Sequence, residues 1–367
     1  TADVVGLDTM AHVIKTLQDN LSLETDPFYG SFETPAVLAK LIELGHLGQK
    51  TKKGFFKKVG RDILRFELES EDYVPAGQKA DDVYARMLKK PAAERLQLLR
   101  NAEGAPGQFL WAILRNSFHY AALHLEHIAE SARDVDQAMR WGFGMKQGPF
   151  ELWQEAGWLQ VAQMVQEDID AGKALCNAPL PAWVFEGPVA EAGGVHTAQG
   201  SWNAAEKKFV ARRVLPVYEK QLFPEKLLGE DSLPDWKTAG TTLFENKALR
   251  AWTLDKDGSP FGGRVLIASI KNKMHAISPE VMESLMEAIE LAEANYQGMV
   301  IWSGDAPFSV GADLEATMPA FVVGGADAID SIEGELQNLM MRLRYAQVPV
   351  VSAIHGMALG GGCELAV

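Results

Sequence analysis

The sequence has little cysteine, no long apolar run and no excess of positive charge. Its two cysteines, Cys176 and Cys363, lie far apart in a chain of 367 residues, which excludes a disulfide framework and is typical of a reducing compartment. No uninterrupted apolar stretch approaches the roughly 18–20 residues that cross a bilayer, and no signal peptide is recognisable. We therefore expect a soluble, cytoplasmic protein of bacterial type.

The charge balance narrows the possible partners. The formal net charge is −14, from 49 acidic and 35 basic residues. General nucleic-acid binding and docking on anionic membranes both need basic surfaces, so neither is expected. An anionic small ligand stays possible, because a few lysines and backbone N–H groups are enough to hold a phosphate. The length predicts more than one domain.

Hydrophobic periodicity divides the chain into four segments. Three- and four-residue spacing of apolar side chains predicts helices in residues 1–58 and again in residues 105–232. Residues 59–104 have no strong period and read as a linker with short helices. In the long helical segment, Ser131 or Asp134 is a candidate start for a second helix, and Gly148-Pro149 is a clear break. From about residue 240 the pattern changes.

The helical part contains an internal repeat. GQKTKKGFF (48–56) aligns with GVHTAQGSW (194–202), and upstream ADVVGLD (2–8) resembles WQEAGWL (153–159). The two matches occur in the same order and with similar spacing. We therefore expect a duplicated helical half-domain rather than a chance recurrence of glycine and threonine.

The last segment alternates strands with helices. RVLIASIKNK, GMVIWSG and VPVVSAIHG are apolar, β-branched runs bounded by glycine or polar residues, and they predict strands. SPEVMESLMEAIELAEA and DSIEGELQNLMMRLRYA predict helices between them, the first with Ser278 as its N-cap and Pro279 at its first position. This alternation predicts a largely parallel α/β layer.

Two glycine-bearing turns follow two of these strands. They are GDAPFSVGADLEA (304–316) and HGMALGGGCELA (355–366), and ligands of such sheets bind at the carboxyl ends of the strands. The three glycines open a helix whose first N–H groups have no acceptor. One N–H from each turn would form an oxyanion hole for a thioester oxygen. Glu364, one turn into the helix, is a candidate general base or acid.

The last segment resembles a known family. IKNKMHAIS (270–278), FSVGADL (308–314) and AIHGMALGGGCELA (353–366) are similar, in order and spacing, to the first half of an enoyl-CoA hydratase (crotonase) domain. The resemblance implies a ββα-spiral fold, oxyanion N–H groups at Ala312 and Gly361, and a catalytic acid at Glu364. It implies a second glutamate about twenty residues further on, beyond Val367. It also implies substrate contacts around the two turns, at Ala276, Gly311, Asp313 and Gly360.

Other residues near these motifs receive simpler interpretations. Asp313 is expected to be a turn or cap residue rather than a catalyst. His275 stands where the family usually has asparagine, so coenzyme A contacts there are not carried over. Cys363 has no obvious histidine partner, and we expect a small packed residue.

Two further groups could suggest ligands. His119, His124 and His127 suggest a metal cluster, but their spacing does not fit a zinc site, so no metal is expected. The basic run of residues 50–58 is expected to be a solvated turn. For that run, a contact to a coenzyme A phosphate stays open.

The helical part resembles a second family. ADVVGLDTM (2–10), GQKTKKGFF, and DVDQAMRWGFGMKQGPFELWQEAG (134–157) are similar to the C-terminal helical domains of 3-hydroxyacyl-CoA dehydrogenases. Gly148-Pro149-Phe150 then marks a turn whose counterpart would precede Thr1. The family's NAD-binding motif and catalytic histidine–glutamate pair would also lie upstream, so NAD is expected but no NAD-binding residue is assigned. We expect a chain cut at both ends and inactive alone.

Together the resemblances imply a multidomain, bifunctional enzyme of fatty-acid β-oxidation. An all-α, duplicated dehydrogenase C-terminal domain would occupy residues 1–58 and 105–232, joined by the linker 59–104. A truncated α/β crotonase domain would occupy residues 240–367. Acyl-CoA would be the substrate. The alternatives are a crotonase-type enoyl-CoA isomerase and an acyl-CoA-binding module with a degenerate hydratase domain. Chain-length preference, product stereochemistry, oligomeric state and a thiolase partner are left undetermined.

Overall fold

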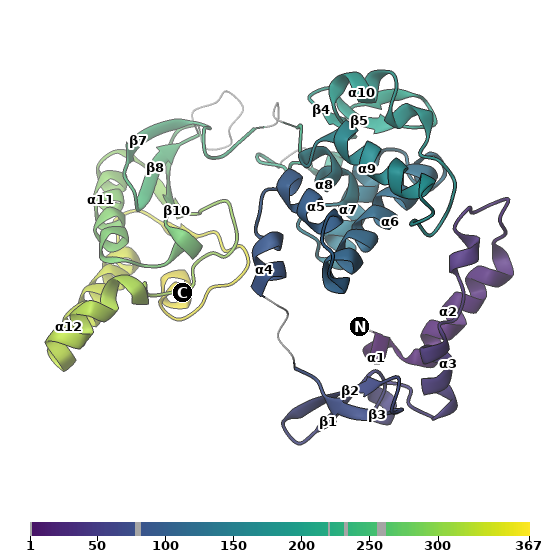
Figure 1. Cartoon of the computed structure of the whole chain (residues 1–367). Coiled ribbons are helices and arrows are strands. Elements are labelled where there is room, and N and C mark those ends of the chain that lie inside the picture. The colour runs from purple at the N-terminus through teal and green to yellow at the C-terminus, as the bar shows by residue number, and fades with distance from the viewer. Residues whose placement is uncertain (1, 78–81, 219–220, 231–233, 255–261) are drawn as a thin grey trace. The chain divides into compact units, whose positions relative to one another are not determined.

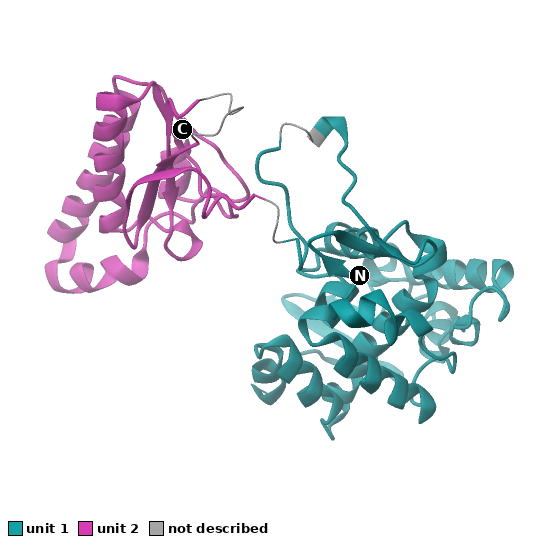
Figure 2. Ribbon diagram, turned by 90° about the horizontal axis from the view of Figure 1, so that it is seen from above, with its two compact units in different colours: residues 1–233 teal, residues 234–367 magenta. Residues whose placement is uncertain are grey.

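The computed structural model describes residues 2–77, 82–218, 221–230, 234–254 and 262–367. The chain divides into two compact units, residues 1–233 and 234–367, coloured separately in Figure 2. No helix among the described residues combines the length and the apolar character that crossing a membrane requires.

The first unit is mostly helical (Figure 1). Its helices are α1 Ala2–Val5, α2 Leu7–Asn20, α3 Ala36–Glu43, α4 Asp82–Leu88, α5 Ala92–Arg100, α6 Ala105–Ile128, α7 Ala132–Phe143, α8 Pro149–Glu155, α9 Trp158–Asp170 and α10 Pro188–Ala192. Short 3-10 turns occupy Tyr29–Ser31, Gln49–Thr51, Ala182–Val184 and Pro216–Tyr218. Helix α7 begins after Ser131, whose backbone N–H and hydroxyl both donate to Asp134. Helix α8 begins at Pro149, as the Gly148-Pro149 break predicts.

Two small antiparallel sheets interrupt the helices of the first unit. Strands β1 Phe56–Val59, β2 Asp62–Glu67 and β3 Asp72–Pro75 form one, and β4 His196–Thr197, β5 Gly200–Asn203 and β6 Lys208–Val210 form the other. The sequence-based prediction of helix or linker alone was wrong for these segments. Their strands are short and contain many polar or charged residues, so they lack the apolar alternation that marks a half-buried strand.

The expected repeat has a structural counterpart. Gly6 and Gly157 cap the N-termini of α2 and α9 with the same unusual backbone, at φ 109° and φ 99°. A Cβ on Gly48 would lie 2.3 Å from the carbonyl oxygen of Asp3, and a Cβ on Gly194 would lie 2.1 Å from the side chain of Gln154. Asp3 and Gln154 each stand three residues before the capping glycine, so equivalent positions meet in both halves. In both halves a three-stranded sheet follows along the chain, β1 to β3 after Gly48 and β4 to β6 after Gly194.

The second unit is a five-stranded sheet covered by helices. The strands are β7 Thr241–Glu245, β8 Leu249–Thr253, β9 Val265–Ile270, β10 Gly298–Ile301 and β11 Val350–Ser352, in the spatial order β11-β10-β9-β8-β7. The three predicted strands, β9 to β11, are parallel, and β7 and β8 extend the sheet antiparallel. The helices are α11 Pro279–Asn295, α12 Leu314–Arg344 and α13 Gly361–Ala366, with a 3-10 turn at Lys273–His275.

Helix α11 covers one face of this sheet (Figure 1) and begins as the sequence predicts. Ser278 Oγ accepts a hydrogen bond from the Val281 N–H, and Pro279 occupies the first turn. Leu285 and Ile289 are fully buried against the strands. Helix α12 begins sixteen residues earlier than predicted and contains Pro319 and a bend at Gly325, which in sequence resemble breaks.

An ion pair joins α11 to α12 and gives the second unit a pH dependence. Arg342 donates to both carboxylate oxygens of Glu293, at 2.7 and 2.5 Å, and the Gln347 N–H donates at 2.8 Å. These donors lower the pKa of Glu293 from 4.5 to about 2. The stabilisation is therefore fully present above pH 4.5 and is lost as the pH falls towards 2.

We expect Glu293→Gln to lower the thermal midpoint at pH 6 and to have a much smaller effect at about pH 2, where about half of the wild-type carboxylate is protonated. Thermal unfolding followed by circular dichroism across this pH range measures the difference. A difference that stays constant from pH 6 to pH 2 would show that the carboxylate charge contributes nothing.

Candidate active site

The first turn holds Ala312 in a short parallel bridge to Ile277. The Ile277 N–H donates to the Gly311 carbonyl at 2.7 Å, and the Asp313 N–H donates to the Ile277 carbonyl at 2.9 Å. In a strand-like segment successive N–H groups point to opposite sides. The N–H of Ala312, which lies between these two bonds, therefore points away from Ile277.

The second turn holds Gly361 at the first position of α13, with Gly360 as the N-cap. An N–H at this position has no acceptor within its own helix. Ser309 joins the two turns, because its N–H donates to the Met357 carbonyl at 3.2 Å and its carbonyl accepts the Leu359 N–H at 3.0 Å. This pairing sets the second turn beside the first.

The two turns bring Ala312 and Gly361 together. A Cβ on Gly361 would lie 3.8 Å from the Ala312 nitrogen, and a Cβ on Gly311 would lie 3.1 Å from the Gly361 nitrogen. Among the backbone hydrogen bonds of the described residues, none uses the N–H of Ala312 or of Gly361 as donor. Two neighbouring N–H groups without acceptors are the elements of an oxyanion hole.

Three of the glycines around this site are needed for different reasons. Gly360 has φ 50° and ψ −127°, a backbone conformation essentially restricted to glycine. Gly311 has φ 89°, and a Cβ there would lie 2.6 Å from the Leu359 carbonyl oxygen. A Cβ on Gly362 would lie 2.6 Å from the Ser309 carbonyl oxygen. Gly361 differs, since a Cβ there meets only ordinary contacts, Leu336 at 3.5 Å being the nearest.

We expect Gly362→Ala to lower the free energy of unfolding by about 1–3 kcal/mol, because the added methyl group overpacks the contact with Ser309. Gly334 in α12 is the matched control, since an added Cβ there meets no atom within 4 Å. Gly334→Ala should be neutral or stabilise by about 0.5–1 kcal/mol. Urea unfolding of both variants decides, and equal stability of the two would contradict the close approach of the turns.

Glu364 lies on the same side of α13 as Gly361, three residues away along the helix. Its side chain is exposed, whereas Gly362 and Leu365 on the other side are buried. The carboxylate is therefore on the solvent side of the helix that presents the Gly361 N–H. Cys363 is exposed, so the expectation of a packed cysteine was wrong. Helix α13 has six residues and buries only the side that carries Gly362 and Leu365, and Cys363 does not lie on that side.

The loop that carries Ala276 is hydrogen-bonded to the first turn. Ala276 is buried, and its carbonyl accepts a hydrogen bond from Asn272 Nδ2 at 2.7 Å. The His275 side chain is also buried and its Nδ1–H donates to the Pro307 carbonyl at 2.7 Å. The His275 carbonyl in turn accepts the Ser309 hydroxyl at 2.7 Å. The histidine that departs from the family pattern thus holds the turn in place instead of facing a ligand.

Asp313 has the capping role that the sequence suggested. Its Oδ1 accepts a hydrogen bond from the Ala316 N–H at 3.1 Å and so caps α12. The structure therefore brings Gly311, Ala312, Gly360 and Gly361 together, places Glu364 on the adjacent helix turn, and gives Ala276 and Asp313 positions that fix the first turn.

Two of the three histidines that suggested a metal, His119 and His124, have other partners. His124 Nε2 lies 3.2 Å from Asp26 Oδ1, and the Tyr120 hydroxyl donates to Asp26 Oδ2 at 3.0 Å. His119 Nε2 donates to the Ala178 carbonyl at 2.7 Å. No cluster of three or more potential metal ligands is found in the described part of the chain. Asp26 instead anchors the loop after α2 on helix α6.

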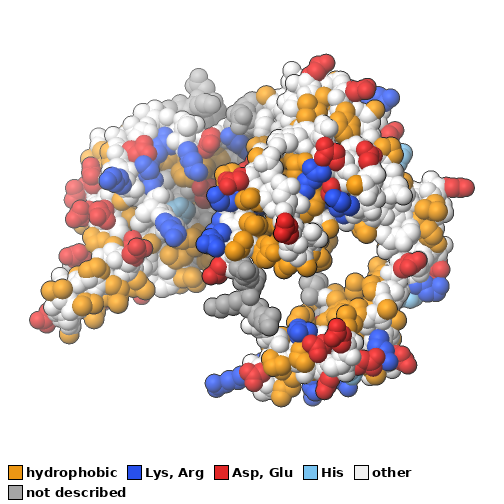
Figure 3. All heavy atoms as spheres, in the orientation of Figure 1, with side chains coloured by type: hydrophobic (Ala, Val, Ile, Leu, Met, Phe, Trp, Pro, Cys, Tyr) orange, Lys and Arg blue, Asp and Glu red, His pale blue; other side chains and the backbone are white. Residues whose placement is uncertain are grey.

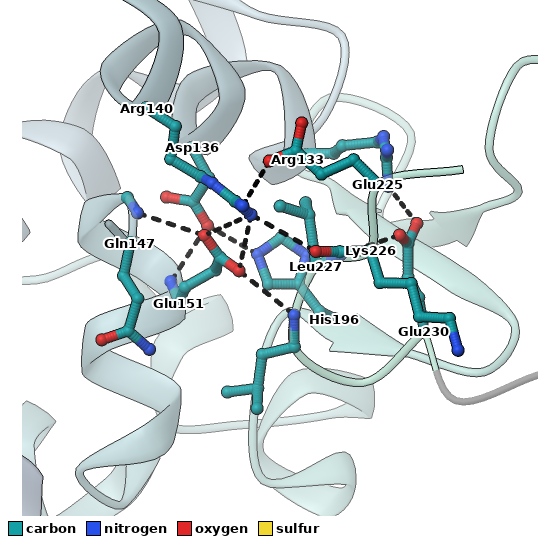
Figure 4. Close-up of polar contacts among 12 residues, drawn as sticks. Arg133, Asp136, Arg140, Gln147, Glu151, His196, Glu225, Lys226, Leu227 and Glu230 are labelled. Atoms are coloured by element: carbon teal, nitrogen blue, oxygen red, sulfur yellow. Dashed lines mark hydrogen bonds and ion pairs between the residues drawn. The ribbon is translucent and has the colours of Figure 1, made fainter. Parts of the chain in front are cut away.

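A second polar cluster, which was not predicted from the sequence, lies inside the first unit (Figure 4). His196 Nδ1 lies 2.8 Å from Ser201 Oγ, and His196 Nε2 lies 2.7 Å from Asp136 Oδ2. This chain of contacts from serine through histidine to aspartate resembles the catalytic triad of a hydrolase. However, these residues are only 0–2% exposed, so no substrate reaches the hydroxyl, and the cluster is structural.

Asp136 links three elements through this cluster. Its carboxylate accepts the N–H groups of Phe150 and Glu151, both at 2.9 Å, and so caps α8 from the neighbouring helix α7. A Cβ on Gly148 would lie 2.2 Å from Asp136 Oδ1, which explains the glycine before Pro149. Burial raises the pKa of the Asp136 carboxyl, and the hydrogen bond to His196 opposes this shift.

We expect Asp136→Ala to lower the free energy of unfolding by about 3–5 kcal/mol, because it leaves His196 and two buried N–H groups without their acceptor. Asp19→Ala is the control, since Asp19 forms an exposed pair with Lys15 and should cost less than about 0.5 kcal/mol. Urea unfolding followed by tryptophan fluorescence compares them. Similar losses for both would contradict the structural role of the cluster.

Comparison with known proteins finds two families, each similar to a different segment of the chain. Residues 1–58 match the family of 3-hydroxyacyl-CoA dehydrogenase C-terminal domains, and residues 264–367 match the enoyl-CoA hydratase/isomerase family. The "Probable 3-hydroxyacyl-CoA dehydrogenase" of Bacillus subtilis is 27% identical over 374 residues, which cover 99% of this chain and 43% of that protein. The chain thus spans less than half the length of this relative.

Two further similarities are shorter. The "Fatty acid oxidation complex subunit alpha" of Pseudomonas putida is 32% identical over 94 residues, which cover 26% of this chain and 13% of that protein. The crystal structure of an enoyl-CoA hydratase/isomerase from Xanthobacter autotrophicus Py2 has 25% identity and a TM-score of 0.29, and covers 33% of this chain and 43% of that one. The chain thus contains a helical segment, residues 1–58, that is similar to 3-hydroxyacyl-CoA dehydrogenase C-terminal domains, and a segment, residues 264–367, that is similar to the enoyl-CoA hydratase/isomerase family.

Proposed function

We propose that the whole protein is a cytoplasmic enzyme of fatty-acid β-oxidation that acts on acyl-CoA thioesters, and that its second unit hydrates 2-enoyl-CoA. The observation that carries this proposal is the pair of neighbouring N–H groups, of Ala312 and Gly361, without acceptors in the described residues. The names of the relatives, which include a dehydrogenase and a fatty acid oxidation subunit, support the pathway.

The proposed chemistry follows from the polarity of the thioester. When water adds to C3 of a 2-enoyl-CoA, negative charge moves to the thioester oxygen and an enolate forms. The N–H groups of Ala312 and Gly361 would stabilise that oxygen, an effect worth roughly 3–4 kcal/mol per donor in comparable sites. Glu364 would act with a second glutamate to position and activate the water and to supply the proton to C2.

A dehydrogenase activity is the second part of the proposal. The whole protein would oxidise 3-hydroxyacyl-CoA with NAD, as the name of the Bacillus subtilis relative suggests. The 367 residues contain no Gly-x-Gly-x-x-Gly segment, so no residue of this chain is assigned to NAD and no step is derived through it. We expect these residues alone to show no NAD-dependent oxidation and no hydration.

Enoyl-CoA isomerisation is the alternative reaction, because the matching family includes both hydratases and isomerases. It needs the same oxyanion hole but different acids. Assays of the whole protein with crotonyl-CoA and with a 3-enoyl-CoA distinguish the two. Faster turnover of crotonyl-CoA supports hydration. Turnover of the 3-enoyl-CoA alone would show that the second unit is an isomerase and not a hydratase. Saturable acyl-CoA binding without turnover of either substrate would contradict an enzymatic role.

A further inference from the structure

A short segment of the first unit concentrates positive charge in an acidic protein. Residues 48–66 contain seven lysines and arginines and one acidic residue, whereas the whole chain has a net charge of −14. The segment comprises the 3-10 turn Gln49–Thr51, strand β1 and most of strand β2. Such a local reversal of charge attracts anions to this part of the surface.

Four of these lysines have no ion-pair partner among the described residues. Lys50 is paired with Asp8 at 2.5 Å, but no ion pair involves the set Lys52, Lys53, Lys57 and Lys58. Their field reaches a neighbouring side chain, since burial and the positive charges of Lys53 and Lys57 lower the pKa of His46. Lys57 Nζ also lies 5.4 Å from the centre of the Tyr73 ring, but no carboxylate among the described residues neutralises any of the four positive charges.

The same four lysines line one hollow, which we call the basic hollow. Its remaining lining residues are Asp3, Val4, Gln49, Phe56, Gly60 and Ile63. Strand pairing sets Lys58 directly opposite Ile63, with Phe56 two residues along the same face. Phe56 and Ile63 are 54% and 55% exposed. Basic, acidic and hydrophobic side chains cover this small sheet at the bottom of Figure 3.

The backbone holds the lysines at this hollow. Lys52 has φ 61°, in the left-handed region that a lysine rarely adopts. Two hydrogen bonds between Gly48 and Lys53, at 2.8 and 3.1 Å, close the turn around it. The one acid in the hollow, Asp3, is engaged, because its carboxylate accepts the N–H groups of Phe55 and Phe56, both at 2.8 Å. The hollow therefore offers lysine side chains on an ordered backbone beside an exposed aromatic ring.

We propose that the basic hollow binds the nucleotide end of coenzyme A, at residues separate from those of the two glycine turns. This rests on the proposed function, in which every substrate is a coenzyme A thioester. The pyrophosphate and the 3′-phosphate of that nucleotide would form ion pairs with the lysine ammonium groups. Its flat adenine would pack against the ring of Phe56. The site would raise the local concentration of acyl-CoA and retain intermediates between reactions.

A membrane surface fits the same sheet less well. Glu67, Glu69, Glu71 and Asp72 lie at the β2–β3 end of the sheet, and an extended layer of anionic headgroups would be repelled by them. None of these four acids lines the basic hollow, so a nucleotide bound there does not contact them. The hollow is also partly polar inside, with Gln49 and Asp3 in its lining.

Chemical footprinting of lysines tests the proposal on the unmodified whole protein. Acetylation of each lysine is measured by mass spectrometry with and without adenosine 3′,5′-bisphosphate at low ionic strength, where exposed charges are least screened. We expect the four lysines of the hollow to react at least about fivefold more slowly with the nucleotide present. The exposed Lys15, Lys89, Lys146 and Lys173 should react as before.

A second measurement uses two matched variants. Calorimetry should detect no binding of adenosine 3′,5′-bisphosphate to a variant with all four lysines of the hollow changed to glutamine. The same change at the four control lysines should leave the affinity for this nucleotide within about twofold of wild type. Equal protection of all lysines, protection by inorganic phosphate at the same concentration, or protection by phosphatidylglycerol vesicles alone would overturn the proposal. The probe carries no thioester, so protected lysines in a protein that fails to hydrate crotonyl-CoA would refute the hydratase and keep this site.

Discussion

Replacing Glu364 by glutamine in the whole protein should lower the rate of crotonyl-CoA hydration by about 10³-fold, within the range of general acid–base catalysis. Glutamine has nearly the same shape, and the exposed position of Glu364 on the first turns of α13 means that the fold should not change. The amide cannot take a proton from water. The loss should therefore appear in kcat, with little change in KM.

The control for Glu364→Gln is the dehydrogenase reaction of the same variant, which should stay within about twofold of wild type because it uses other residues. Glu315→Gln is a matched substitution, since Glu315 is also an exposed acid in the first turn of a helix of the second unit. It should leave hydration unchanged. Hydration by Glu364→Gln at near the wild-type rate would remove Glu364 from the mechanism.

Removing the Gly361 N–H should have the second large effect. Gly361 is the first residue of α13, a position where proline is well tolerated in helices. Gly361→Pro therefore deletes one oxyanion donor and no hydrogen bond of the described fold. We expect hydration to fall by about 10²–10³-fold, as for the loss of one donor in other oxyanion holes.

Gly361→Ala is the matched control for Gly361→Pro. It keeps the N–H, and its Cβ would make only ordinary contacts, 3.5 Å to Leu336 and 3.6 Å to Ile277. We expect less than about a tenfold loss of kcat with alanine, because the donor remains in place. Equal loss of kcat in the alanine and proline variants would show that space at this turn matters and that the N–H does not.

The sequence predicted the parts of this fold that have strong local signals. Strands β9 to β11 are apolar runs with clear boundaries, and Ser278 and Ser131 are helix N-caps, so their positions follow from propensity. The two glycine turns were also recognisable, because glycines directly after a strand indicate close backbone approach. The meeting of the two turns was expected because both follow strands of one sheet. The assignment of the two N–H groups to Ala312 and Gly361 came only through the resemblance to a family.

Other parts could not be read from the sequence for physical reasons. Strand β1 contains Lys57 and Lys58, and its neighbours carry polar residues on an open face, so alternation is weak. Helix α12 is kinked at Gly325, whose backbone is not helical (φ 58°, ψ −140°). The part of α12 around Pro319 has no core-facing stripe that the sequence could reveal, since Val322 and Val323 are 79% and 91% exposed. The capping of α8 by Asp136 depends on residues that meet only in the folded unit. Burial of His275 against Pro307 is likewise a tertiary contact.

The central claim is that the N–H groups of Ala312 and Gly361 polarise a bound thioester carbonyl. Infrared difference spectroscopy measures this directly, with carbonyl-¹³C-labelled crotonyl-CoA bound to the Glu364→Gln protein, which should bind the substrate but turn it over about 10³-fold more slowly. We predict a carbonyl stretch at lower frequency than in water, because two fixed donors polarise the bond more than solvent does, and a smaller shift when Gly361→Pro is added. A bound carbonyl that absorbs at its frequency in water, or a shift unchanged by the proline, would contradict the claim.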